Sequence, residues 1–359
     1  MPTGRVIKNV SARPLALPTN TAQALEILRK KFNLPALAVT VVRDGKICDR
    51  AAVGVRKLGD RTPVTILDRF QIGSCTKSMT ATHAAMLIEE GKLCWSTTIA
   101  EVFPELKGKM DKQYEIATVE QLLAQRGGIP SELPANALKI AWDQNGTPTE
   151  QRYEYMKALL ARPPEVAPGT KLIYSNQSYT VVGAMLEKIV GKPWEELITE
   201  KLFKPLHMDS ACFGSLGATG GVDQPWGHTP ESLPKQSDYL PAMAADCGVH
   251  CSLSDLARYT IFQMEGEQRD GLLKAETFRK LHAPSDGDNY ACGWMCAKRD
   301  WAGGNVLWHN GANSFWYVLM LLALKRDFSV IAATNISGDV ARPGCVEVSY
   351  AMIKKWLTN

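Results

Sequence analysis

The amino-acid sequence predicts an α/β (α+β) fold, in which an antiparallel sheet flanked by helices is interrupted by a helical insertion. Two observations support this prediction. Strand hairpins are expected near both ends of the chain, each beside a terminal helix, whereas the segment between them is mainly helical. The chain has 359 residues, which is enough for two domains or for one domain with a large insertion, because domains average roughly 100–200 residues.

The N-terminal end begins with an amphipathic helix expected over residues 21–32. Strands are expected over 36–42 and 46–53, and Asp44-Gly45 between them is a two-residue hairpin signal. Near the other end, a second strand pair is expected over 315–324 and 328–334. A helix from about Cys345 closes the chain.

The middle of the chain contains several helical segments separated by loops rich in glycine and proline. We expect helices over 118–124, 149–160, 179–190 and 193–203. These segments suggest a division into a sheet domain, formed by 1–93 and 246–359, and a helical domain formed by 94–245.

Composition excludes several classes of function. The net charge is only +4, and the longest apolar run has ten residues, from Phe315 to Leu324. We therefore expect neither nucleic-acid binding nor a membrane span. The first twenty residues lack a signal-peptide pattern, so we expect either a cytoplasmic protein or a periplasmic or secreted one whose signal peptide was removed. The oligomeric state stays open.

Nine cysteines are scattered along the chain, and their odd number does not define a disulfide framework. Two pairs, Cys247/Cys251 and Cys292/Cys296, have a spacing of four. Neither pair is a C-x-x-C motif, so the pattern favours free buried thiols over a metal site.

Ser74 and Lys77 form the first candidate catalytic element. They lie at the start of a helical stretch that ends at Gly91, and their i, i+3 spacing puts both side chains on one face. A desolvated lysine can become neutral and take a serine proton. The alternative is a capping serine followed by a surface lysine. Ser232 and Lys235 also match S-x-x-K, but Pro234 between them argues against a helix.

Two further elements could complete a site. Tyr174 and Asn176 lie on a loop before the helix expected over 179–190, where one could relay a proton and the other could donate a hydrogen bond; the alternative is a turn with an asparagine cap. His309 stands at the start of a strand-like run and is followed by Gly311 and Ala312. Glycine permits close approach of a substrate, and the next amide can face a developing oxyanion. A lone histidine at a strand edge is also a common structural residue.

Taken together and in this order, these three elements resemble those of the penicillin-recognising serine hydrolases. The resemblance is greatest to the branch with Tyr-x-Asn, which includes class C β-lactamases, D-alanyl-D-alanine carboxypeptidases, D-aminopeptidases and β-lactamase-like carboxylesterases. It extends from about residue 20 to the C-terminus and includes the segments 122–129, 167–191, 205–208 and 254–258.

The resemblance implies a β-lactamase/transpeptidase-like fold with an all-helical inserted domain, and an active site between the two domains. Ser74 would be acylated, Lys77 and Tyr174 would share the general base and acid roles, and no metal or organic cofactor would be needed. The remaining implied roles concern substrate binding: Asn176 would position Lys77 and the acyl side chain, the Ser74 and Ala312 amides would form the oxyanion hole beside Gly311, and His309 would replace a family lysine.

Two departures from the family pattern change what the resemblance implies. The Lys-Thr-Gly element is His309-Asn310-Gly311 here, which is more typical of peptidase and esterase members, and a neutral histidine attracts a carboxylate less than lysine does. The histidine of the family's Leu-Leu-x-His segment is Gln125. The predicted function is a serine hydrolase that cleaves a β-lactam, a D-amino-acid peptide or a carboxylic ester, so the expected partner is a small-molecule or peptide substrate. The alternative is a non-catalytic module that recognises peptidoglycan or a protein partner.

Overall fold

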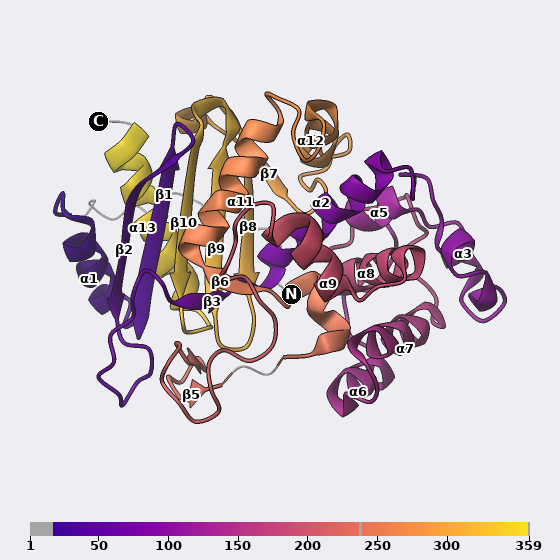
Figure 1. Ribbon diagram of the computed structural model, residues 1–359, viewed down its shortest axis with the longest axis horizontal. Coiled ribbons are helices and arrows are strands. Elements are labelled where there is room, and N and C mark those ends of the chain that lie inside the picture. Colours follow the sequence, from indigo (N-terminus) through magenta and orange to yellow (C-terminus); the bar gives the residue numbers. More distant parts are fainter. Residues whose placement is uncertain (1–16, 237–238, 358–359) are drawn as a thin grey trace.

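The structure is a computed structural model that describes residues 17–236 and 239–357. Its centre is a six-stranded antiparallel sheet in the order β2-β1-β10-β9-β8-β7 (Figure 1). The strands are β1 (Ala36–Arg43), β2 (Lys46–Gly54), β7 (Met295–Arg299), β8 (Gly304–Ala312), β9 (Tyr317–Ala323) and β10 (Phe328–Thr334). The first strands therefore lie beside the last one, and the predicted fold class is confirmed.

Both predicted hairpins are present. Asp44 (φ 51°) and Gly45 (φ 68°) connect β1 to β2, and positive φ at both central residues is what a type I′ turn requires. A short 3₁₀ turn, Leu324–Arg326, connects β9 to β10. Between the two hairpins, β1 pairs with β10 and Ala38 is aligned with Ala333, which joins the two ends of the chain.

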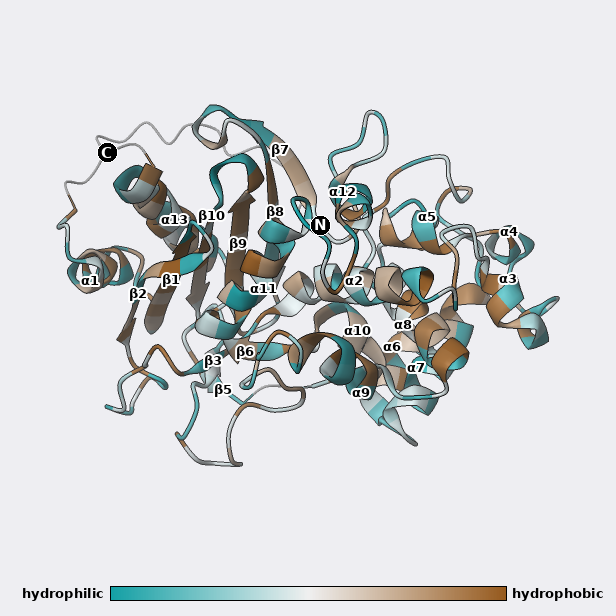
Figure 2. Ribbon diagram, turned by 45° about the horizontal axis from the view of Figure 1, so that its top comes forward, coloured by the Kyte–Doolittle hydropathy of each residue, from teal (hydrophilic) through white to brown (hydrophobic). Residues whose placement is uncertain are grey.

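Helices cover both faces of the sheet. Helices α1 (Thr21–Lys31) and α13 (Ala341–Leu357) lie on one face, and α11 (Leu253–Gly266) lies on the other (Figure 1). All seven residues of β10 are buried, which explains why its sequence is apolar without alternation. Figure 2 shows hydrophobic residues along the central strands. Helix α13 begins four residues before the predicted start, because a proline in the first helical turn loses no hydrogen bond.

The remaining helices gather beside the sheet (Figure 1). They are α2 (Thr76–Glu89), α3 (Ile99–Val102), α4 (Lys112–Glu115), α5 (Val119–Leu123), α6 (Ala135–Asp143), α7 (Pro148–Leu160), α8 (Asn176–Val190), α9 (Trp194–Ile198), α10 (Ala244–Cys247) and α12 (Ala275–His282). A π-helical turn, Thr199–Phe203, continues α9. Two short strand pairs, β3 (Arg69–Gln71) with β6 (His250–Ser252) and β4 (Gly227–His228) with β5 (Pro234–Lys235), complete the described elements.

The division of the chain into 1–93 with 246–359 and 94–245 stays a prediction. The β4–β5 pair lies inside the range expected to be helical, and His228 Nδ1 lies 2.6 Å from the Asn335 carbonyl oxygen next to β10. One continuous hydrophobic cluster includes residues of the sheet and of the helices beside it. None of the helices in the described ranges combines the length and apolar character needed to cross a membrane.

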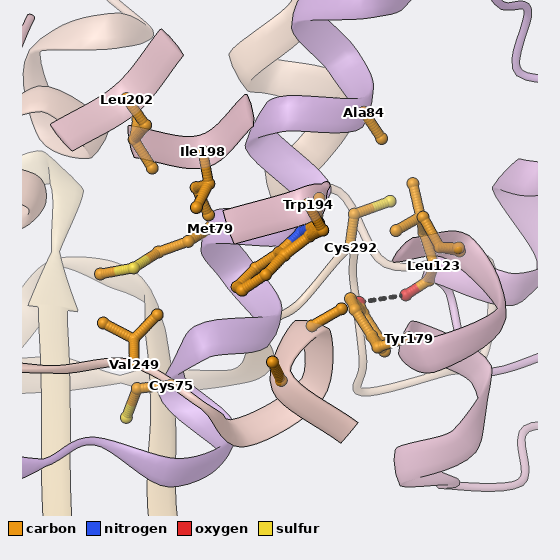
Figure 3. Packing of buried hydrophobic residues seen from close by; sticks show 14 of the residues in the cluster. Cys75, Met79, Ala84, Leu123, Tyr179, Trp194, Ile198, Leu202, Val249 and Cys292 are labelled. Atoms are coloured by element: carbon orange, nitrogen blue, oxygen red, sulfur yellow. Dashed lines mark hydrogen bonds between the residues drawn. The ribbon is translucent and has the colours of Figure 1, made fainter. Parts of the chain in front are cut away.

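Helix α2 lies at the centre of this cluster and is buried continuously from Thr76 to Leu87. Figure 3 shows Met79 of α2 on one side of Trp194 of α9, and Tyr179 of α8 on the other. The Tyr179 hydroxyl donates a 2.6 Å hydrogen bond to the Leu123 carbonyl oxygen at the end of α5 (Figure 3). Packing of α8 against α2 thus fixes the N-terminal ends of the two helices relative to each other.

Replacing Tyr179 with phenylalanine should lower the free energy of unfolding by about 1–2 kcal/mol, because the buried Leu123 carbonyl loses its hydroxyl donor. Urea unfolding curves of wild type and Tyr179→Phe measure the change. The matched control is Tyr350→Phe, which alters a tyrosine that is 42% exposed. Equal unfolding midpoints for wild type and Tyr179→Phe would contradict the prediction.

Candidate active site

Ser74 and Lys77 lie together at the start of α2. Residues Gly73–Cys75 form a 3₁₀ turn that leads into the helix, and Ser74 is partly exposed while Lys77 is fully buried. Lys77 Nζ donates a hydrogen bond of 3.0 Å to Ser74 Oγ. The predicted i, i+3 spacing therefore brings the two side chains into contact, and the positive potential of a helix N-terminus acts near the serine. Ser232 and Lys235 lie in a turn and in β5 instead.

Asp246 of α10 provides two further oxygens near Lys77 Nζ. Its carbonyl oxygen accepts a 3.1 Å hydrogen bond, and its carboxylate Oδ1 lies 3.9 Å away. Burial lowers the pKa of Lys77, but the acidic groups of Tyr174 and Asp246 raise it by more than burial lowers it. The pKa therefore lies above that of an ordinary lysine. The expected route to a neutral lysine by desolvation is thus opposed by Tyr174 and, next, by the Asp246 carboxylate, which comes from a distant part of the chain.

Tyr174 and Asn176 reach the same region. The Tyr174 ring centroid lies 5.5 Å from Lys77 Nζ, and 37% of this residue is exposed. Asn176 is the first residue of α8 rather than a loop residue, because the helix begins three residues before its predicted start, directly after Ser175. Among the described contacts, Asn176 Oδ1 is buried without a hydrogen-bond partner, and no hydrogen bond joins Asn176 to Lys77.

Gln125 holds the segment that carries Tyr174. Its side-chain oxygen accepts a 2.9 Å hydrogen bond from the Ser175 amide, and its carbonyl oxygen accepts one of 2.8 Å from the Ile173 amide. Gln125 is fully buried and has a φ of 59°. The sequence marked this position only as a departure from the family pattern, whereas the structure gives it a direct contact with the Tyr174 loop.

Gly311 and Ala312 lie against the turn Gly73–Cys75, because Gly73 and Gly311 leave room for backbone contact. A Cβ atom on Gly311 would lie 1.7 Å from the Ile72 carbonyl oxygen. A Cβ atom on Gly73 would lie 3.1 Å from Gly311 Cα and 3.2 Å from the Ala312 nitrogen, and the φ of Gly73 is +49°. No larger residue fits at 311, so the end of β8 lies directly beside the residue that precedes Ser74.

His309 lies in the second half of β8 rather than at the start of a strand, because the strand already begins at Gly304. The side chain is buried, with Nδ1 2.8 Å from the Asn310 carbonyl oxygen and Nε2 3.4 Å from the Tyr290 hydroxyl. A ring that donates from Nδ1 must accept at Nε2, so both nitrogens are used. Burial, and then the charge of Lys77, lower the pKa of His309 to about 3. The imidazole is therefore neutral.

Tyr290 is a neighbour of this site that the sequence did not indicate. Its ring centroid lies 5.8 Å from that of Tyr174 and 6.0 Å from that of His309, and the Tyr174 and His309 rings are 6.1 Å apart. The three rings therefore contact one another. Tyr290 belongs to a loop before β7 with no catalytic motif around it, so only the tertiary contact identifies it.

All nine cysteines lie within the described residues, and none of them forms a disulfide. Three of the four cysteines in the noted pairs have elevated pKa values. Burial raises the pKa of Cys292 to about 12 and of Cys296 to about 11, and raises that of Cys251 well above the ordinary value. Within the ranges that the structure describes, no group of three His, Cys, Asp or Glu side chains could hold a metal ion.

Comparisons with known proteins place this chain in a family. The family model described as Beta-lactamase matches residues 22–344. Protein flp of Staphylococcus aureus (strain COL) is 22% identical over 86% of this chain and 61% of its own length, so the chain spans about three fifths of that relative. Penicillin-binding protein 4 of Amycolatopsis lactamdurans is 25% identical over 89% of this chain and 85% of its own length.

Solved structures show the same fold. The octameric penicillin-binding protein homologue from Pyrococcus abyssi has a TM-score of 0.76 at 23% identity, over 91% of this chain and 75% of that one. The D-alanine carboxypeptidase AmpC from Burkholderia cenocepacia has a TM-score of 0.74 at 20% identity, over 93% and 97%. The expected β-lactamase/transpeptidase-like fold is confirmed, and the chain belongs to the Beta-lactamase family.

Proposed function

We propose that this protein is a serine hydrolase that cleaves an ester or amide through an acyl-enzyme on Ser74. One observation carries the proposal: Lys77 Nζ lies 3.0 Å from Ser74 Oγ at a helix N-terminus, beside the backbone of Gly311 and Ala312. A nucleophile with an adjacent ionisable group, and amides beside it, is the arrangement that acyl transfer requires.

The reaction has two halves. Ser74 Oγ attacks the substrate carbonyl carbon and forms a C–O bond, while the serine proton passes to the Lys77–Tyr174 pair and the carbonyl electron pair moves to oxygen. The amides of Ser74 and Ala312 are the proposed donors to this oxyanion. Collapse breaks the bond to the leaving group, which takes a proton from the pair, and a water molecule then hydrolyses the acyl-serine.

Three segments meet at this site, and we propose that they come from two domains. Ser74 with Lys77, and His309 with the end of β8, belong to the part that contains the sheet. Tyr174 and Asn176 belong to the helical part. The unpartnered Asn176 Oδ1 is proposed to accept a hydrogen bond from the acyl portion of the substrate.

The environment of His309 supports a substrate without a carboxylate at this end of the site. Where the family resemblance expects a lysine, this side chain is uncharged and both of its nitrogens already have partners, Asn310 and Tyr290. A substrate carboxylate would gain neither a positive charge nor a free N–H there. Of the three substrate classes, neutral carboxylic esters therefore fit the site best.

Ser74→Ala should abolish both turnover and adduct formation. We would incubate wild type and Ser74→Ala with nitrocefin, penicillin, a p-nitrophenyl short-chain ester and a fluorophosphonate, and record intact-protein mass spectra. The wild type is expected to gain the mass of an acyl or phosphonyl group, because in the proposed reaction Ser74 Oγ attacks the reagent and Lys77 lies 3.0 Å away to take part in the proton transfer. Activity that survived in Ser74→Ala would refute the nucleophile assignment, and no adduct with any reagent would favour a non-catalytic binding module.

Neutral esters should be preferred over matched anionic ones. We expect kcat/KM for phenyl butyrate to exceed that for 3-carboxyphenyl butyrate, whose carboxylate is on the leaving group, by roughly tenfold, a difference of about 1.4 kcal/mol. The reason is the neutral state of His309 across the whole range from pH 5 to 9, since its pKa is about 3. The ratio should accordingly stay constant over that range. A preference for the carboxyphenyl ester, or a ratio that changes near pH 6.5, would contradict the prediction.

Gly311→Ala should reduce kcat for any accepted substrate by roughly 10²–10³-fold, the loss that follows removal of one oxyanion donor. The added Cβ must displace the Ile72 carbonyl, which lies 1.7 Å from its position, and this shifts the serine turn away from Ala312. Gly271→Ala is the matched control, because no atom lies within 4 Å of its Cβ position. Initial rates with equal circular dichroism spectra test the prediction, and unchanged kcat in Gly311→Ala would be inconsistent with it.

A further inference from the structure

Tyr174 lies in a segment that no helix or strand holds in place. Residues 172–175, between the turn that ends near Thr170 and helix α8, have no regular secondary structure. Tyr174 is 37% exposed, so packing holds only part of its side chain. Its position beside Lys77, with the ring centroid 5.5 Å from Nζ, therefore depends on hydrogen bonds from this segment to other parts of the chain.

Both amides that flank Tyr174 donate to one residue, Gln125. The Ile173 amide donates to the Gln125 backbone carbonyl oxygen at 2.8 Å, and the Ser175 amide donates to the Gln125 side-chain oxygen at 2.9 Å. Gln125 and Ser175 are both buried, so the second hydrogen bond is shielded from competing water. A single residue thus holds the segment on both sides of the tyrosine.

The backbone of Gln125 has a conformation that needs such compensating contacts. Its φ of 59° lies in the left-handed region, which residues other than glycine, asparagine and aspartate rarely adopt. Gln125 directly follows Ala124, the C-terminal cap of α5, and Tyr179 holds the end of α5 through the Leu123 carbonyl oxygen. An unfavourable backbone conformation persists only where its surroundings determine it, and such residues cluster at functional sites. Here the surroundings include the two hydrogen bonds from the segment of Tyr174.

Arg126, the next residue, extends the same attachment. Its carbonyl oxygen accepts a 2.8 Å hydrogen bond from the Gly169 amide, and its guanidinium donates to the Gly169 carbonyl oxygen at 2.9 Å. The guanidinium also pairs with Asp288, two residues before Tyr290. The end of α5 is therefore connected both to the loop of Tyr174 and to the loop of Tyr290, and the ring centroids of these two tyrosines lie 5.8 Å apart.

We propose that Gln125 is a positioning residue for the proposed reaction: by accepting from the amides on both sides of Tyr174, it keeps the tyrosine side chain beside Lys77 and Ser74. This inference rests on the proposed hydrolase function, in which the serine proton passes to the Lys77–Tyr174 pair. Without the Gln125 side-chain oxygen, the buried Ser175 amide loses its acceptor, and the segment must move to find another one. A displacement of about 1 Å in a group that takes part in the reaction can slow it by roughly 10²-fold.

The direct test is hydrogen exchange of the Ser175 amide in wild type, Gln125→Met and a control. Methionine has a similar length to glutamine but no strong acceptor. We expect the Ser175 amide to exchange roughly tenfold faster, or more, in Gln125→Met, because it loses its hydrogen bond. The matched control is Gln151→Met, which replaces another buried glutamine, one that donates to the Gly146 carbonyl oxygen at 2.9 Å. This control should leave exchange of the Ser175 amide unchanged.

The functional readout is the rate at which a fluorophosphonate labels Ser74 at about pH 8, where a histidine of ordinary pKa is neutral. We expect this rate to fall by roughly tenfold or more in Gln125→Met, and to equal the wild-type rate in Gln151→Met. Gln125→His should recover most of the rate, because a neutral imidazole offers one acceptor nitrogen in place of the amide oxygen. A Gln125→His protein that is labelled as slowly as Gln125→Met would contradict the acceptor role.

A double-mutant cycle shows whether Gln125 acts through Tyr174. In a Tyr174→Phe background the tyrosine hydroxyl is absent, so the placement of the ring no longer affects proton transfer, and Gln125→Met should slow labelling by less than about threefold. A purely structural role would slow labelling equally in both backgrounds. An equal loss in both backgrounds would therefore overturn the proposal.

Failure of this inference and failure of the proposed function give different results. If wild type is not labelled at all, the hydrolase function fails, and hydrogen exchange alone decides whether Gln125 holds the Tyr174 segment. If Gln125→Met does not fold, Gln125→Asn takes its place, because asparagine tolerates a positive φ and its shorter side chain withdraws the oxygen from the Ser175 amide. Faster exchange and slower labelling are expected in this variant too. Unchanged exchange of the Ser175 amide in either folded variant would overturn the inference.

Discussion

The contact between Gly311 and Ile72 is the constraint on which the candidate site depends. A Cβ atom at 311 would lie 1.7 Å from the Ile72 carbonyl oxygen, so the end of β8 and the residues before α2 touch through backbone atoms alone. The sheet thereby sets the distance between the Ala312 amide and Ser74. Helix α2 is buried over almost its whole length, so the helix that carries Lys77 is also held in place by close packing.

The second constraint is the set of buried polar and charged side chains next to Ser74. Lys77, Asp246 and Thr180 come from three helices, and each is fully buried. Removing one member of such a set leaves an uncompensated group, which is more costly than replacing the whole set by apolar residues. These three side chains therefore specify how α2, α8 and α10 pack. They lie where the proposed chemistry needs a fixed geometry.

Local signals explain why much of the fold could be predicted from the sequence. Asp44-Gly45 and the apolar strands beside it determine a hairpin within a few residues, and helix periodicity located α1, α7 and α8 to within three residues. Motif spacing also placed Ser74 beside Lys77. Asp246, Tyr290 and the hydrogen bonds of Gln125 could not be predicted in the same way, because each acts through a partner far away in the chain. The sequence predicts a strand start at His309, because the glycines before it conceal the first half of β8.

The distribution of charge in the site has a consequence for what it can stabilise. The buried cation, Lys77, lies behind Ser74, whereas His309, at the end where the family resemblance expects a second cation, is neutral. A cation behind the nucleophile stabilises negative charge that develops during attack, while a cation at the substrate end would stabilise a carboxylate equally before and after attack. Only the first kind of interaction is stronger in the transition state than in the bound substrate, and so raises the rate of the chemical step. For the proposed hydrolase, this arrangement keeps the cation that serves acyl transfer and lacks the cation that would select anionic substrates. Substrates would then be distinguished by their acyl and leaving groups rather than by a fixed carboxylate.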